Sequence, residues 1–97
     1  MNENVSSSFL MPTYGDRTIE FKQGKGCYLF SSDNNRYLDF GSGIAVNSLG
    51  HCHPILVKTL QKQAEKLWHT SNLYYSSLQE ELAEILCNNT FADKVFF

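Results

Sequence analysis

The sequence predicts an α/β fold, of which these residues form the N-terminal portion only: a small antiparallel β-meander, two amphipathic helices and the start of a buried strand. Three observations support this prediction. Between residues 19 and 40, short apolar or alternating stretches are separated by turn-forming residues. After residue 53, apolar residues recur every three or four positions, which is the helical period. The last three residues are apolar without alternation, as in a strand buried on both faces.

Composition narrows the class of protein. The 97 residues are 42% hydrophobic and 13% aromatic with a net charge of −2, which is typical of an ordinary globular protein. The sequence has no basic patch for a nucleic-acid partner and no apolar run long enough to cross a membrane. Three cysteines do not make the framework of a secreted disulfide scaffold, and the first ten residues lack the features of a targeting peptide. We therefore expect a cytoplasmic protein.

Three short strands are predicted in the first half of the chain. The alternation over Ile19–Lys22 predicts the first strand, and glycines then interrupt it. Cys27–Phe30 and Arg36–Phe40 are the second and third strands. The polar residues between them, Ser32–Asn35, suit a hairpin turn because asparagine accepts a positive φ at little cost. A short apolar piece, Ile44–Val46, follows the meander.

The first helix is predicted over residues 54–67. A proline at its start suits the first helical turn, and its apolar residues fall on one stripe. This stripe consists of Val57, Leu60, Ala64 and Leu67. Residues 68–75 then form a linker rich in aromatic and hydrogen-bonding groups.

A second helix follows the linker. Ser76 or Ser77 is expected to cap it, because Gln79 and Glu80 stand three residues later in the two corresponding capping-box patterns. We expect the helix to end near Asn88-Asn89, since asparagine tolerates a left-handed cap.

The predicted elements do not complete a fold by themselves. Two one-sided helices and a terminal strand over Val95–Phe97 need an apolar surface that no other predicted element supplies. We therefore interpret residues 12–97 as a truncated segment of a larger α/β protein, after a flexible lead-in over residues 1–11. The alternative is a small, non-catalytic α+β interaction domain whose apolar C-terminus packs into its own core.

The sequence contains no complete active site that can be built from residue chemistry alone. His51-Cys52-His53 carries zinc-ligand side chains, but adjacent residues in an extended chain point in opposite directions, and no second ligand pair exists. No metal site is predicted, and we expect the imidazoles to bond the loop backbone and help cap the helix at Pro54. The Gly-x-Gly pairs lack the rest of a nucleotide-binding motif, and no Gly-x-Ser-x-Gly occurs.

A longer stretch carries a resemblance. Tyr37–Pro54, YLDFGSGIAVNSLGHCHP, closely resembles the N-terminal segment of class III pyridoxal-phosphate aminotransferases. Within that family, Lys66–Tyr74 (KLWHTSNLY) is similar to the acetylornithine aminotransferases, and the stretches Met11–Tyr14 and Thr90–Phe97 fit the same pattern. The resemblance extends over essentially all residues from Met11 to Phe97.

The resemblance implies the fold and activity of a much larger enzyme. Such enzymes have the fold of type I pyridoxal-phosphate transferases and are usually homodimers. They transfer an amino group from N-acetylornithine to 2-oxoglutarate in arginine biosynthesis, giving N-acetylglutamate semialdehyde and glutamate, with pyridoxal phosphate as cofactor. The family's phosphate-binding loop and Schiff-base lysine lie beyond Phe97. The resemblance thus implies no catalytic, cofactor-binding or metal-binding residue here, and the chain alone is expected to be inactive.

The resemblance also implies a contribution to the substrate pocket. In the family, the loop after the meander and the Thr-Ser-Asn stretch lie near the active site and the dimer interface. Four residues are therefore pocket candidates, with simple packing as the alternative role: Ile44, Val46, Asn72 and Tyr74. Ornithine aminotransferases carry tyrosine at the position of Ile44, whereas an aliphatic residue suits an acylated substrate, because burying an unpartnered ammonium is costly. Enzymes for ornithine, succinylornithine or N-succinyl-diaminopimelate remain the alternatives.

Overall fold

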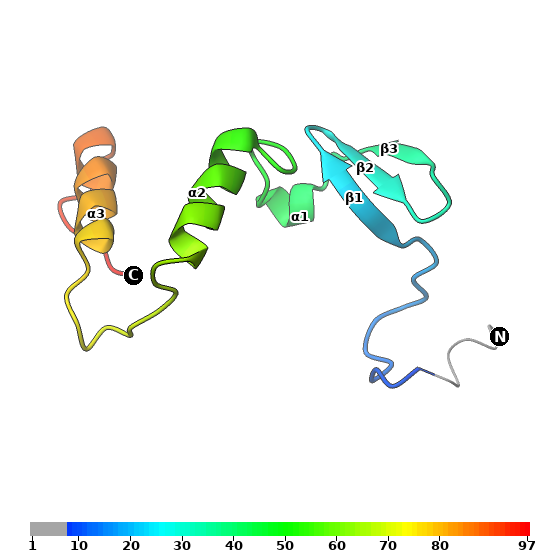
Figure 1. The fold of residues 1–97 in the computed structure, drawn as a ribbon, viewed down its shortest axis with the longest axis horizontal. Helices are drawn as coiled ribbons and strands as arrows, with labels where there is room; N and C mark the ends of the chain where they lie inside the picture. The colour runs from blue at the N-terminus through cyan, green and yellow to red at the C-terminus, as the bar shows by residue number, and fades with distance from the viewer. Residues whose placement is uncertain (1–7) are drawn as a thin grey trace. The chain divides into compact units, whose positions relative to one another are not determined.

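The computed structural model describes residues 8–97 (Figure 1). Its elements, in chain order, are β1 (Phe21–Lys25), β2 (Tyr28–Ser31), β3 (Arg36–Leu38), α1 (Ser42–Ala45), α2 (Pro54–Ala64) and α3 (Ser77–Asn89). The contacts divide the chain into two compact units, one ending at Lys62 and the other covering Gln63–Phe97. Of the predicted flexible lead-in, residues 1–7 lie outside the described residues, and residues 8–11 are exposed and belong to no helix or strand.

The three strands form an antiparallel sheet in the order β1-β2-β3, which confirms the predicted meander. The predicted end of the first strand at Lys22 is wrong, because β1 continues through Gly24 to Lys25 and pairs there with β2. Gly24 pairs with Leu29 between β1 and β2, and Leu29 pairs with Tyr37 between β2 and β3. The register of β1 shifts between Phe21 and Gln23, where a bulge interrupts the pairing. Each neighbour in this sheet is therefore also a neighbour along the chain, joined by a short turn.

Ser31 organises the turn between β2 and β3. Its hydroxyl accepts a hydrogen bond from the Asn35 amide at 3.1 Å and donates to the carboxylate of Asp33. The hydrogen bond from this hydroxyl is the main reason why the pKa of Asp33 lies below its ordinary value. Asn34 has a φ of 65°, so the prediction of a positive φ at an asparagine in this turn is confirmed.

The helix α2 ends three residues before the predicted end at Leu67, so that part of the prediction is wrong. The amide of Lys66 bonds the carbonyl of Gln63 at 3.0 Å, which tightens the last turn. The indole Nε1 of Trp68 donates to the carbonyl of Ala64 at 2.6 Å and takes the place of a further backbone donor. The aromatic residue that follows the stripe thus closes the helix.

The helix α3 begins where the capping pattern predicts and ends differently. Ser76 is the N-cap, and its hydroxyl accepts from the Gln79 amide at 3.3 Å. The helix ends at Asn89 as predicted, but the left-handed asparagine cap is wrong: Thr90 follows in an extended conformation with a φ of −135°. The hydroxyl of Thr90 instead donates to the carbonyl of Leu86 at 2.7 Å, and this side-chain bond satisfies one of the last free carbonyls.

Residues 8–97 bury no hydrophobic side chain, and their one buried residue is Ser31 at 5% exposure. The apolar stripes of α2 and α3 are therefore uncovered in both units. The predicted strand over Val95–Phe97 is absent, and Phe96 is 97% exposed. A strand requires a neighbour to pair with, and none of the described strands pairs with these residues. No helix in the described part of the chain is long and apolar enough to cross a membrane.

Candidate functional site

A hydrogen bond between two side chains joins the end of the meander to the loop that precedes α2. Asp39 directly follows β3, and His51 lies shortly before Pro54, where α2 begins. The Nε2 atom of His51 is 2.6 Å from Oδ2 of Asp39, and the two side chains are only 17% and 11% exposed. An ionised carboxylate only accepts hydrogen bonds, so Nε2 carries the hydrogen of this contact.

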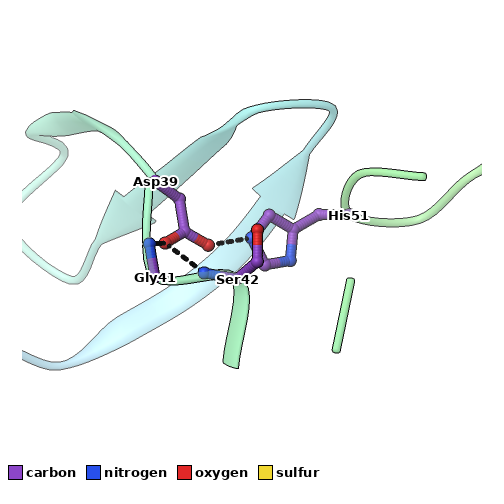
Figure 2. Close-up of polar contacts among 4 residues, drawn as sticks. All are labelled: Asp39, Gly41, Ser42 and His51. Carbon is purple, nitrogen blue, oxygen red and sulfur yellow. Dashed lines mark hydrogen bonds and ion pairs between the residues drawn. The ribbon is translucent and has the colours of Figure 1, made fainter. Parts of the chain in front are cut away.

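The other oxygen of Asp39 binds the backbone that follows it. Oδ1 accepts hydrogen bonds from the amides of Gly41 and Ser42, each at 2.9 Å. Figure 2 shows the carboxylate between these amides and the ring of His51. The amide of Ser42 is the main cause, followed by His51, that the pKa of Asp39 lies below its ordinary value. The site therefore favours the ionised carboxylate.

The backbone of His51 is fixed to the hairpin independently of its side chain. Gly26 and His51 form an antiparallel bridge, in which the two amides bond the two carbonyls at 3.0 and 2.8 Å. A Cβ atom on Gly24 would stand 2.7 Å from Cγ of His51, so only glycine leaves room for the ring. Gly50 has a φ of +85° and lies against the backbone of Gly26, which again requires glycine. We name this arrangement of Asp39 and His51 against the hairpin the Asp–His clamp.

The short helix α1, which the clamp adjoins, is a left-handed turn. All four of its residues have a positive φ: Ser42 (50°), Gly43 (64°), Ile44 (63°) and Ala45 (60°). The amides of Ala45 and Val46 close the turn on the carbonyls of Gly41 and Ser42 at 3.0 and 2.8 Å. For residues other than glycine, this conformation costs about 1–2 kcal/mol each, and β-branched residues rarely adopt it. The sequence predicted only a short apolar piece here.

The left-handed turn and the residue directly after it carry two of the four predicted pocket residues. Ile44 is 95% exposed and Val46 is 72% exposed, so neither packs within its own unit. Strained backbone of this kind is concentrated at functional sites, where surrounding contacts maintain it. The turn is thus a candidate surface for a ligand or for another part of the protein.

The other two predicted pocket residues lie together in the second unit. Asn72 and Tyr74 line one hollow of about 220 Å³, whose wall also includes His69 and Ser76. Asn72 also borders a second hollow, of about 340 Å³, together with Phe97. The structure therefore places Ile44 on the left-handed turn with Val46 directly after it, and it groups Asn72 with Tyr74 in one hollow.

The histidines beside Cys52 have roles that differ from one another. The Nδ1 atom of His53 accepts from the Ile55 amide at 3.3 Å, so the predicted contribution of this imidazole to the start of α2 is confirmed. His51 instead bonds the carboxylate of Asp39, which the sequence did not single out. The pattern Asp39-x-Gly41 could have indicated a turn in which the carboxylate bonds the backbone. Within residues 8–97, no three His, Cys, Asp or Glu side chains form a group that could hold a metal ion.

Comparisons with known proteins agree on one family. A family model described as Aminotransferase class-III matches residues 11–97. Acetylornithine aminotransferase 1 of Bradyrhizobium diazoefficiens is 53% identical over 94 residues, which cover 97% of this chain and 23% of that protein. The chain therefore spans about a quarter of the length of this curated relative.

Solved structures of whole enzymes contain the same fold. The N-acetylornithine aminotransferase of Stenotrophomonas maltophilia superposes with a TM-score of 0.77 and 41% identity, over 84% of this chain and 22% of that one. The ornithine δ-aminotransferase of Plasmodium falciparum superposes with a TM-score of 0.83 and 28% identity, over 94% and 24% of the two chains. These matches confirm the predicted fold class, an N-terminal portion of an α/β transferase. The chain belongs to the class-III aminotransferase family.

Proposed function

We propose that residues 12–97 are the N-terminal segment of an acetylornithine aminotransferase, a cytoplasmic homodimer that uses pyridoxal phosphate. It transfers an amino group from N-acetylornithine to 2-oxoglutarate and so serves arginine biosynthesis. The observation that carries this proposal is the 53% identity, over 97% of the chain, to a protein of that name. The fold alone does not separate the substrates, because an acetylornithine and an ornithine enzyme both superpose well.

Ile44 supports the acylated substrate over free ornithine. The side chain is aliphatic and stands out on the left-handed turn, where a ligand can reach it. An apolar surface favours an acyl group, whereas a free α-ammonium group buried against it would lack a partner. In the proposed enzyme, Ile44 contributes to the pocket from this turn and Val46 from the position after it, while Asn72 and Tyr74 contribute from the hollow that they share.

The residues described here do not fit pyridoxal phosphate by themselves. A Schiff-base lysine has to lie in a desolvated pocket, but all six lysines of this segment are exposed. Lys22 and Lys25 border a hollow of about 600 Å³ on the meander, yet no carboxylate lines it to pair with the ring nitrogen. We expect the 97-residue chain alone to be inactive.

The test is a chimera in which this chain replaces the matching residues of the Bradyrhizobium diazoefficiens enzyme. We expect its kcat/KM to be higher for N-acetylornithine than for ornithine, because the turn presents Ile44. The variant Ile44→Tyr should lower this ratio by about tenfold or more, which is the range for a changed pocket contact. Ile55→Val, a conservative change at an exposed residue of α2 outside the proposed pocket, is the matched control and should leave the preference for N-acetylornithine in place.

Three outcomes would contradict the proposal. A folded chimera that prefers ornithine would favour the ornithine enzymes. A preference for succinylornithine or N-succinyl-diaminopimelate in the same assay would assign the chain to one of those substrates. A cooperative melt of a monomeric 97-residue chain, together with an inactive chimera, would favour the small interaction domain.

A further inference from the structure

We propose that Asp39 and His51 are positioning residues that hold the turn Ser42–Ala45 in its left-handed conformation and thereby direct Ile44 toward the substrate. The positioning role rests on the geometry of the first unit. The consequence for substrate choice rests, in addition, on the function proposed above. Neither residue is proposed to touch the substrate.

The clamp bonds the backbone at the point where its handedness changes. Gly41 has a φ of −79°, and Ser42 has a φ of 50°. The Oδ1 atom of Asp39 accepts from both of these amides at 2.9 Å. The carboxylate therefore fixes the two peptide groups on either side of Gly41, the last right-handed residue before the left-handed turn.

The carboxylate is itself held from two directions. Its Oδ2 atom accepts from the ring of His51 at 2.6 Å, and the amide of Asp39 donates to the carbonyl of Cys27 at 2.8 Å. The ring of His51 packs against Gly24, and its backbone forms the bridge to Gly26. These contacts attach Asp39 to the hairpin, so the position of the turn is fixed relative to the sheet.

Packing of the turn's own side chains does not account for its conformation. Ile44 is 95% exposed, so its side chain makes no buried contact that could offset the unfavourable φ of 63°. The hydrogen bonds within the turn are also available to a right-handed turn. The contacts with Asp39 come from outside the turn and orient the amides of Gly41 and Ser42 relative to the sheet, and on this ground we assign the maintenance of the turn to the clamp.

The experiment uses the chimera and replaces each half of the clamp. Asp39→Ala removes both acceptors, and His51→Phe keeps a ring without a donor. We expect each variant to lower the ratio of kcat/KM for N-acetylornithine over ornithine by about tenfold, because a displaced contact residue changes binding in the pocket. The change should be in KM, with kcat altered less than about threefold, since no reacting atom is touched.

Two further variants separate positioning from general stability. Asp39→Asn keeps one acceptor oxygen for the amides of Gly41 and Ser42, so it should restore most of the ratio that Asp39→Ala loses. Asp33→Ala is the matched control, because Asp33 is also an aspartate of the meander bonded to a nearby side chain, Ser31, and lies outside the clamp. It should leave the ratio unchanged. Melting temperature and dimer content check that every variant is folded.

The crystal structures of the chimera and of its Asp39→Ala variant test the geometry without reference to activity. We expect the φ of Ser42 and Ile44 to become negative in the variant. A variant that keeps the left-handed turn would overturn the proposal, as would folded Asp39→Ala and His51→Phe enzymes with an unchanged ratio. If the unmodified chimera prefers ornithine, the proposed function fails, and the structure of the variant alone decides the positioning role.

Discussion

The two units of this chain maintain their structure by interactions of different range. In the unit that ends at Lys62, hydrogen bonds join residues far apart in sequence, such as Gly26 with His51 and Asp39 with His51. Within residues 63–97, side chains bond only residues up to four positions away, as Trp68 does with Ala64. The first unit therefore defines the position of a loop relative to a sheet, whereas the second defines where one helix begins and ends.

The largest expected effect comes from Gly24, where the long-range contacts converge. Gly24→Val places a Cβ 2.7 Å from the ring of His51, so the ring has to move away from the hairpin. We expect a loss of about 1–3 kcal/mol in the local opening free energy of this loop, as for other overpacked sites. Hydrogen exchange at the amides of Gly26 and His51 in the chimera measures it.

The control for this substitution is Gly15→Val. A Cβ at Gly15 would have no atom within 4 Å, so exchange in the loop should stay as it is. Equal exchange at Gly26 in the Gly24→Val variant would mean that the ring of His51 can move aside freely. The long-range contacts of the first unit would then constrain the loop less than its hydrogen bonds indicate.

A smaller and strictly local effect is expected in the second unit. Ser76→Ala removes the N-cap acceptor of α3, which typically costs about 1 kcal/mol. Exchange should accelerate at the first-turn amides, including that of Gln79, and should not change in the loop around His51. Ser77→Ala is the matched control, because this serine stands inside the helix. Faster exchange in both units after Ser76→Ala would contradict the separation of local from long-range contacts.

The smallest effect is the pH dependence of the clamp. The pKa of Asp39 lies below its ordinary value of 3.8, mainly because of the Ser42 amide and then His51. The ionised carboxylate is thus favoured by the folded state, so its contribution is complete above pH 3.8 and is lost as the pH falls through the lower, folded-state pKa. The chemical shift of the Ser42 amide, followed by NMR, should titrate with a midpoint below 3.8.

Asp39→Asn provides the comparison for that titration. The variant cannot ionise at this position, so the low-pH change in the Ser42 signal should disappear, while the change at Asn35 caused by Asp33 should remain. A midpoint for Ser42 at or above 3.8 in the unmodified protein would contradict the geometry of the clamp. Either result reports on the long-range contact alone, since α3 contains neither group.

Features that depend on contacts between residues close in sequence could be predicted from the sequence. The turn with Asn34 at positive φ and the N-cap at Ser76 follow from residues that act on their immediate neighbours. The end of α2 was predicted three residues too late. The indole of Trp68 donates a hydrogen bond to the carbonyl of Ala64, and such a contact leaves no trace in the spacing of apolar residues along the sequence. The extended cap at Thr90 was missed for the same reason: a side-chain bond competes with the expected left-handed residue.

The candidate site was predicted only in part. Ile44 was predicted to be a pocket residue through the family resemblance, and the structure adds that it lies on a left-handed turn. The pairing of Asp39 with His51 could not be predicted, because it depends on how the hairpin brings Gly24 and Gly26 beneath the loop. A contact between residues so far apart in sequence can be predicted only when the arrangement of the strands is already known.

The close approach of Gly24 to His51 also limits which substitutions positions 24 and 51 can accept during evolution. An alanine at position 24 would stand 2.7 Å from Cγ and 2.8 Å from Cβ of His51, so it becomes acceptable only when position 51 is also glycine. The two positions should therefore show strong epistasis, with the double variant less damaged than the sum of the single ones. Among descendants of this sequence, a change at position 24 should be found only where position 51 has already become glycine, and has thereby lost the partner of Asp39.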